Sequence, residues 1–205
     1  VLDTAASDSV SFSEVDNLGK VLYNHAYFDH HIDAVRNLDL VNVEAIRKCR
    51  FKVVVDGVNS SGGIVVPLLL DLLGVTTIKL HCIPNGNFPH NPEPLKEHLT
   101  DLSEKVLQSG ADFGIAVDPD VDRLAFMDEK GVLFGEEYTL VACADYVLSQ
   151  KKGNTVSNLS STRALRDITE KHGAVYTASA VGEVNVVAAM KATKAVIGGE
   201  GNGGI

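Results

Sequence analysis

The sequence predicts an α/β protein made of two three-layer α/β/α units with mixed, mostly parallel sheets, the second unit truncated. Short apolar segments alternate with segments of helical period along most of the 205 residues, and strands separated by helices form parallel sheets covered on both faces. This alternation restarts near residue 132. Because the chain stops within the glycine loop at 198–204, we expect the second unit to be cut short.

These observations divide the chain into three regions. Residues 1–17 are small and polar with no hydrophobic period, which indicates a tail or linker. The first unit is expected at 18–132 and the second at 133–205.

In the first unit, the hydrophobic pattern predicts three helices and four strands. Asn42 is a good N-cap for the first helix, and Gly110 ends the third. Pro67 fits the second helix only if it lies in the first turn. The expected helices are 42–49, 64–73 and 95–110, and the expected strands are 51–55, 76–83, 113–117 and 123–128.

The second unit repeats the alternation. Its expected helices are 136–150, 161–172 and 184–192, and its expected strands are 155–159, 174–177 and 195–197.

Composition excludes several classes of function. The 18 Lys and Arg against 27 Asp and Glu give a net charge of −9, so no basic surface is available for nucleic acid. No apolar run approaches the roughly 20 residues of a membrane span, and the N-terminal segment has no signal-peptide pattern. Three scattered cysteines favour free thiols in a reducing, cytoplasmic compartment.

Three aspartates form the most informative motif. Asp118, Asp120 and Asp122 alternate in DPDVDR directly after a buried strand, at the sheet edge where parallel α/β folds place ligands. In an extended segment these carboxylates would share one side, and Mg²⁺ would remove their repulsion. The competing interpretation is a solvated acidic turn, and the position after a buried strand favours the metal site.

Two other known kinds of acidic loop fit DPDVDR less well. An EF-hand requires Gly at the sixth position, where this sequence has Arg123, and helices where this sequence has strands. A phosphatase of the haloacid dehalogenase type would use Asp118 as nucleophile, but its motif has Thr or Val where Asp122 stands. That phosphatase stays as an alternative that shares Mg²⁺.

The glycine loop GGEGNGG carries a second candidate site. Its formal GxGxxG, at Gly199, Gly201 and Gly204, is a weak dinucleotide signal because no helix follows. A flexible turn would not explain Glu200 and Asn202, whose carboxylate and amide can bind sugar hydroxyls on a backbone that permits close approach.

Taken together, these motifs resemble those of the α-D-phosphohexomutases, the phosphoglucomutase/phosphomannomutase family that includes phosphoglucosamine mutases. DPDVDR resembles the family's metal loop and GEGNGG its sugar-binding loop. The segments VVVDGVNSSGG, NGNFPHNPEP, SSTRAL and AVGEVNV follow in family order from about Leu18 onward.

The resemblance implies a Mg²⁺-dependent enzyme that interconverts hexose 1-phosphate and 6-phosphate through a phosphoserine and a bisphosphate. It implies that this chain is the second and most of the third of four domains. The phosphoserine domain and the phosphate-binding domain would lie outside the chain, so we expect the fragment alone to be inactive. A non-catalytic metal- and sugar-binding module is a further alternative, and the oligomeric state is left open.

The resemblance also implies roles for individual residues. Arg123 would face the transferred phosphoryl group, or would only pair with neighbouring acids. Glu183 would meet a substrate amine, or would be a first-turn acid stabilised by its helix. Arg163 would touch substrate or lie on a helix surface. The implied metal ligands are Asp118, Asp120 and Asp122, and the implied substrate-binding residues are Glu200, Asn202, Gly201, Glu183 and Arg163.

Several conspicuous residues are expected to have no catalytic role. Ser60 and Ser61 are interpreted as strand-to-helix packing, and His90 as structural. The pair His30 and His31 is interpreted as solvated surface.

Overall fold

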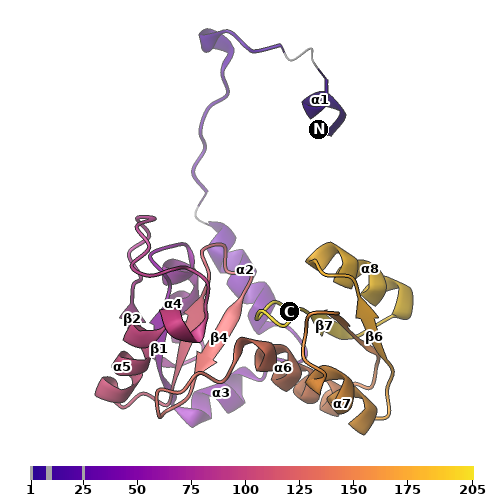
Figure 1. The fold of residues 1–205 in the computed structure, drawn as a ribbon. Coiled ribbons are helices and arrows are strands. Elements are labelled where there is room, and N and C mark those ends of the chain that lie inside the picture. Colours follow the sequence, from indigo (N-terminus) through magenta and orange to yellow (C-terminus); the bar gives the residue numbers. More distant parts are fainter. Residues whose placement is uncertain (1, 8–10, 25) are drawn as a thin grey trace.

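The computed structural model describes residues 2–7, 11–24 and 26–205, so residues 1, 8–10 and 25 lie outside the described part. Within the predicted tail are two short turns, α1 (Leu2–Ala5) and the 3₁₀ turn η1 (Val15–Asn17). In Figure 1, α1 and η1 lie away from the body of the molecule. The next helix, α2 (Ala26–Arg36), was not predicted from the sequence; it buries Ile32, while His30 and His31 are exposed as expected.

The first sheet has four strands in the order β2-β1-β3-β4. The strands β1, β2 and β3 are parallel, and β4 pairs antiparallel with β3. The predicted mixed, mostly parallel sheet is therefore confirmed. The strands are β1 (Lys52–Asp56), β2 (Thr76–Leu80), β3 (Phe113–Val117) and β4 (Leu124–Met127).

Helices cover both faces of this sheet (Figure 1). Alternation along β1 sends Val54 to the face covered by Leu102 and Val106 of α5, and Val53 and Val55 to the opposite face. That second face is covered by α3 and α4. The helical elements of this unit are α3 (Val43–Cys49), α4 (Gly62–Leu72), the 3₁₀ turn η2 (Lys96–His98) and α5 (Thr100–Ser109).

The second sheet is parallel, with strand order β6-β5-β7. In Figure 1, α6 and α7 lie on one side of it and α8 on the other. Leu140, Leu165 and Ile197 belong to the core between α6, α7 and β7. The elements are α6 (Glu136–Gln150), β5 (Thr155–Asn158), α7 (Ala164–Lys171), β6 (Tyr176–Ser179), α8 (Glu183–Thr193) and β7 (Ile197–Gly199).

Three helix predictions need correction. The helix α7 begins at Ala164 rather than at residue 161, because the N–H of Ser161 donates to the carbonyl of Asn158 in a turn before the helix. The helix α4 begins at Gly62, so Pro67 lies beyond the first turn. The helix starts early because Ser61 already accepts the N–H groups of Ile64 and Val65. The helix α5 begins at Thr100 rather than near residue 95, because Leu99 has a non-helical backbone (φ −106°, ψ 27°).

The structure has no helix, within its described residues, of the length and hydrophobicity that a bilayer span requires. The exact boundaries expected at residues 17 and 132 stay a prediction.

Candidate active site

The acidic loop, residues 118–123, lies at the carboxyl end of β3, and its backbone forms a turn. Asp118 is buried, whereas Asp120 and Asp122 are exposed. The N–H of Val121 donates to the carbonyl of Asp118 at 3.2 Å, and Val121 has a left-handed backbone with φ 65°. The extended conformation assumed from the sequence is therefore wrong. The turn nevertheless brings one oxygen of each carboxylate within 4.8 Å of the others.

Asp118 organises this turn. Its Oδ1 accepts the backbone N–H groups of Asp122 at 3.1 Å and of Arg123 at 3.0 Å. Burial, reinforced by the neighbouring carboxylates of Asp122 and Asp120, raises the pKa of Asp118 from 3.8 to about 6. Three crowded carboxylates are a donor set suited to a hard cation, which would relieve the same repulsion.

Arg123 is held by acidic side chains. Its Nε lies 3.4 Å from Oδ2 of Asp118 and 3.6 Å from Oδ1 of Asp122. Its Nη1 pairs with the carboxylate of Glu93, which belongs to the loop after β2. The predicted pairing of Arg123 with neighbouring acids is therefore observed. These ion pairs hold the guanidinium beside the acidic loop.

Ser60 and Ser61 support the acidic loop from the side of β1. Both hydroxyls donate to the carbonyl of Pro119, at 2.7 Å and 3.1 Å. Both hydroxyl hydrogens are therefore engaged by this carbonyl, although Ser61 is exposed. The sequence shows two serines after a strand, which indicates hydrogen bonding near the strand end. It does not show that both serines bind the carbonyl of Pro119.

The glycine loop after β7 is organised by Glu200. Its Oε1 accepts hydrogen bonds from Nδ2 of Asn158 at 2.6 Å and from the N–H of Gly182 at 2.8 Å. Its Oε2 has one longer contact, at 3.5 Å, with Nδ2 of Asn202. Sequence reasoning missed Asn158, a buried amide at the carboxyl end of β5.

The two loops meet directly. The N–H of Leu124, one residue after Arg123, donates to the carbonyl of Gly203 at 3.2 Å. Gly203 has φ 95°, and a Cβ there would lie 2.6 Å from the carbonyl oxygen of Leu124. Only glycine therefore permits this approach.

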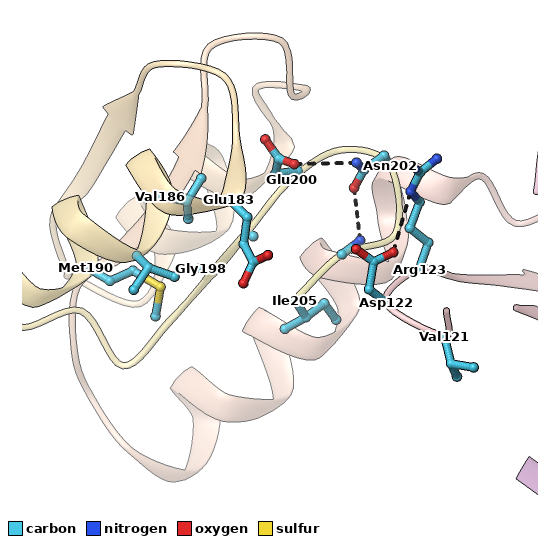
Figure 2. Close-up of a pocket in the computed structure, with 13 residues that line it drawn as sticks. Val121, Asp122, Arg123, Glu183, Val186, Met190, Gly198, Glu200, Asn202 and Ile205 are labelled. Atoms are coloured by element: carbon cyan, nitrogen blue, oxygen red, sulfur yellow. Dashed lines mark hydrogen bonds and ion pairs between the residues drawn. The ribbon is translucent and has the colours of Figure 1, made fainter. Parts of the chain in front are cut away.

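A cavity of about 400 Å³ lies between the loops, and Figure 2 shows its lining. Asp122 and Arg123 come from the acidic loop, and Glu200 and Asn202 from the glycine loop. The complete lining is Val121, Asp122, Arg123, Glu183, Val186, Val187, Met190, Gly198, Gly199, Glu200, Asn202, Gly204 and Ile205.

The remaining predicted residues fall in different places. Glu183 lines the cavity and is also the first residue of α8, so both of its interpretations fit its position. Gly201 instead lines a smaller neighbouring cavity of about 180 Å³, which shares Glu200 and Asn202 with the first. Arg163 lines neither of these cavities; its side chain is 77% exposed and lies 3.8 Å from Asp167.

Comparison with known proteins identifies the family. The family model described as phosphoglucomutase/phosphomannomutase, alpha/beta/alpha domain II, matches residues 29–131. The model of alpha/beta/alpha domain III of the same family matches residues 126–205. The chain belongs to the phosphoglucomutase/phosphomannomutase family.

Individual members of the family agree with this assignment. A phosphoglucomutase/phosphomannomutase of Thermococcus kodakarensis is 40% identical over 85% of the chain and 38% of its own length. A phosphoglucosamine mutase of Nitratidesulfovibrio vulgaris is 36% identical over 74% of the chain and 34% of its own length. A solved structure of a family protein from Burkholderia thailandensis matches 78% of this chain and 37% of its own, with TM-score 0.70 and 30% identity.

The chain therefore spans well under half the length of these family members. The family models cover both the acidic loop and the glycine loop. The haloacid dehalogenase interpretation finds no support in these matches.

Proposed function

We propose that this chain supplies the metal-binding and sugar-binding parts of a Mg²⁺-dependent phosphohexomutase, which interconverts hexose 1-phosphate and 6-phosphate. The observation that carries the proposal is the contact between Leu124 and Gly203, because it places the acidic loop and the glycine loop on one cavity. A mutase requires this proximity, since the phosphoryl group and the sugar must be held at the same time.

The acidic loop fits Mg²⁺ by its donors. Asp118, Asp120 and Asp122 offer three carboxylate oxygens, the ligand type that Mg²⁺ prefers. When bound, the cation would neutralise charge on the transferred phosphoryl group. Arg123 would act on the same group, because its guanidinium lies beside these carboxylates and lines the cavity.

The glycine loop would hold the sugar. Since Oε1 of Glu200 already accepts two hydrogen bonds, its Oε2 is the oxygen available to sugar hydroxyls. The amide of Asn202 lines the same cavity and can both donate and accept. Glu183 would face the part of the sugar that distinguishes substrates, and its carboxylate would favour an amine, as in glucosamine phosphate.

Phosphoryl transfer itself would need a serine outside these residues. In the proposed cycle, the phosphoserine O–P bond breaks as a sugar hydroxyl forms a new O–P bond, and the proton of that hydroxyl passes to the serine oxygen. The resulting bisphosphate then returns its other phosphoryl group to the serine. We therefore propose that the 205-residue chain alone does not interconvert glucose 1-phosphate and glucose 6-phosphate.

The test is Asp120→Asn in the full-length parent protein. Asp120 forms no hydrogen bond or ion pair among the described residues, so its substitution should leave the fold unchanged. We expect turnover to fall at least tenfold at low Mg²⁺, because a hard-cation site loses one of its three charges. Glu129→Gln, an exposed acid in the next turn, is the matched control. Full activity of Asp120→Asn at low Mg²⁺ would show that the loop is only an acidic turn.

A further inference from the structure

A second cluster of possible ligands lies at the carboxyl edge of the first sheet. Asp56 is the last residue of β1, His81 follows β2, and His90 lies in the next loop. Oδ2 of Asp56 is 3.2 Å from Nδ1 of His81 and 2.9 Å from Nε2 of His90. Each of the three residues offers one ligand atom, and these ligand atoms lie within 4.8 Å of one another. The cluster shares no residue with the acidic loop or the cavity.

The hydrogen-bond partners of His90 favour a cation between its ring and Asp56. Its Nδ1 lies 2.8 Å from the carbonyl of Asn91, which can only accept, so Nδ1 carries the hydrogen. In a neutral imidazole, Nε2 then presents a lone pair to the carboxylate of Asp56. Two electron-rich atoms at 2.9 Å require a positive charge between them, either a proton or a metal ion.

His81 repeats this arrangement. Its Nδ1 faces Asp56, and its Nε2 lies 3.4 Å from Oδ2 of Asp101. Both ring nitrogens therefore face carboxylates, and one N–H cannot serve both. A metal ion beside Nδ1 would leave Nε2–H facing the carboxylate of Asp101.

We propose that Asp56, His81 and His90 bind a first-row divalent transition cation of the Zn²⁺ class. Two imidazoles and one carboxylate are a donor set typical of Zn²⁺ sites. Tetrahedral ligands at about 2.0–2.2 Å from zinc lie about 3.3–3.5 Å apart, so the cluster needs only a small expansion. The imidazoles retain 17% and 15% side-chain exposure, which leaves an approach for the ion.

Each ligand also has the outer partner that metal sites require. The carbonyl of Asn91 orients His90, the carboxylate of Asp101 lies 3.4 Å from Nε2 of His81, and the N–H of Val58 donates to Oδ1 of Asp56 at 2.9 Å. The backbone around the cluster is strained: Val58 and His81 have φ of 46° and 49°. Strain of this kind persists where surrounding structure enforces it, often at binding sites.

The ion would hold the loop after β2 against the sheet. That loop carries His90 and, three residues later, Glu93, the partner of Arg123. Neighbouring Cys82 is not assigned as a ligand, since burial raises the pKa of its thiol and its Sγ contacts the carbonyls of Val55 and Leu80.

The experiment is a titration of the chain with Zn²⁺ in excess Mg²⁺, which fills the acidic loop under the proposed function. We expect one tightly bound Zn²⁺ per chain and at least tenfold weaker binding in His81→Gln and His90→Gln, because ligand loss should cost no less than loss of an outer partner. The matched control is His172→Gln, which removes a His–Asp pair (2.7 Å to Asp145) that has no third ligand among the described residues.

X-ray absorption of the unmodified chain with one equivalent of Zn²⁺ supplies a readout that does not depend on variant folding. Two imidazoles in a nitrogen and oxygen shell are expected. Failure to bind Zn²⁺ in excess Mg²⁺ would show that protons alone fill the cluster. Sulfur in the shell, a shell without imidazole, or unchanged affinity in both histidine variants would equally overturn the assignment.

Discussion

Asp118 differs from its two partners in the acidic loop because it is buried. It accepts two backbone N–H groups, which holds the turn, while Asp120 and Asp122 remain exposed. One carboxylate is therefore structural as well as a candidate ligand. Its raised pKa reflects burial together with the neighbouring negative charges.

Without a divalent cation, this pKa should make stability depend on pH. The folded-state pKa of Asp118, about 6, lies above the ordinary value of 3.8, so the folded chain binds more protons between these values. The contribution of Asp118 to the free energy of unfolding should therefore decrease as pH rises from about 4 to about 6. The free energy of unfolding can be measured by urea denaturation at several pH values in the presence of a chelator. Asp118→Asn should remove this decrease, and Mg²⁺ should weaken it.

The matched control for that series is Asp71→Asn, which changes an exposed acid in α4. It should reproduce the unmodified pH dependence. Identical pH profiles for Asp118→Asn and the unmodified chain would contradict the assignment.

Glu200 holds the glycine loop through Oε1, and its Oε2 is the oxygen proposed to bind sugar hydroxyls. A substitution tests the second of these roles. In the full-length parent, Glu200→Gln should lower kcat/KM for hexose phosphates by about tenfold or more, since hydrogen bonds to a charged group contribute about 1.5–3 kcal/mol. Hydrolysis of the phosphoenzyme by water should change much less, because water as the acceptor does not need to be held by the sugar-binding residues. Steady-state kinetics with both acceptors measures this.

Glu170→Gln, an exposed acid in α7, is the control for the change of charge. Unchanged kcat/KM for every hexose phosphate tested would return the glycine loop to a structural role.

At the level of elements, local signals predicted most of the fold. Both α6 and β3 have the predicted bounds, and Asn42 caps α3 by accepting the N–H of Ala45 at 2.9 Å. Strands β6 and β7 lie about two residues later than predicted. The bounds of β6 and β7 are set by their pairing with β5. The hydrophobic pattern within one segment carries no information about this pairing.

Gly110 offers a direct test of a helix end. It is the left-handed cap of α5, with φ 59°, and a Cβ there would have no atom within 4 Å. Gly110→Ala should therefore lower the free energy of unfolding by about 1–2 kcal/mol through backbone strain alone. Chemical denaturation measures the change. Gly19→Ala, at an open position with no positive φ, should have little effect, and equal effects of the two variants would contradict the strain argument.

At the level of the whole molecule, one backbone contact joins the two units beside the cavity. Leu124 begins β4 of the first sheet, and its N–H donates to Gly203 after the last strand of the second sheet. The hydroxyl of Thr139 in α6 donates to the carbonyl of the same Leu124 at 2.9 Å. The acidic loop and the glycine loop are therefore aligned by groups on both sides of Leu124.

Gly203→Ala should disturb this alignment. The added Cβ would meet the carbonyl oxygen of Leu124 at 2.6 Å, so the loop must withdraw. We expect the Leu124 amide to exchange its hydrogen at least tenfold faster. Gly86→Ala is the control, since it also has positive φ (73°) but open space around the Cβ. Normal protection of Leu124 in Gly203→Ala would show that this contact does not hold the loops together.

The sequence by itself determined the α/β class, the two units and the residues of the acidic and glycine loops, because these follow from periodicity, turn chemistry and local motifs. It also carried the family resemblance. Only the tertiary structure decided that Leu124 meets Gly203, that Asn158 holds Glu200, and that Asp56 lies between His81 and His90. These partners are separated by 25 to 79 residues, and only chain packing brings such distant side chains and backbone groups together.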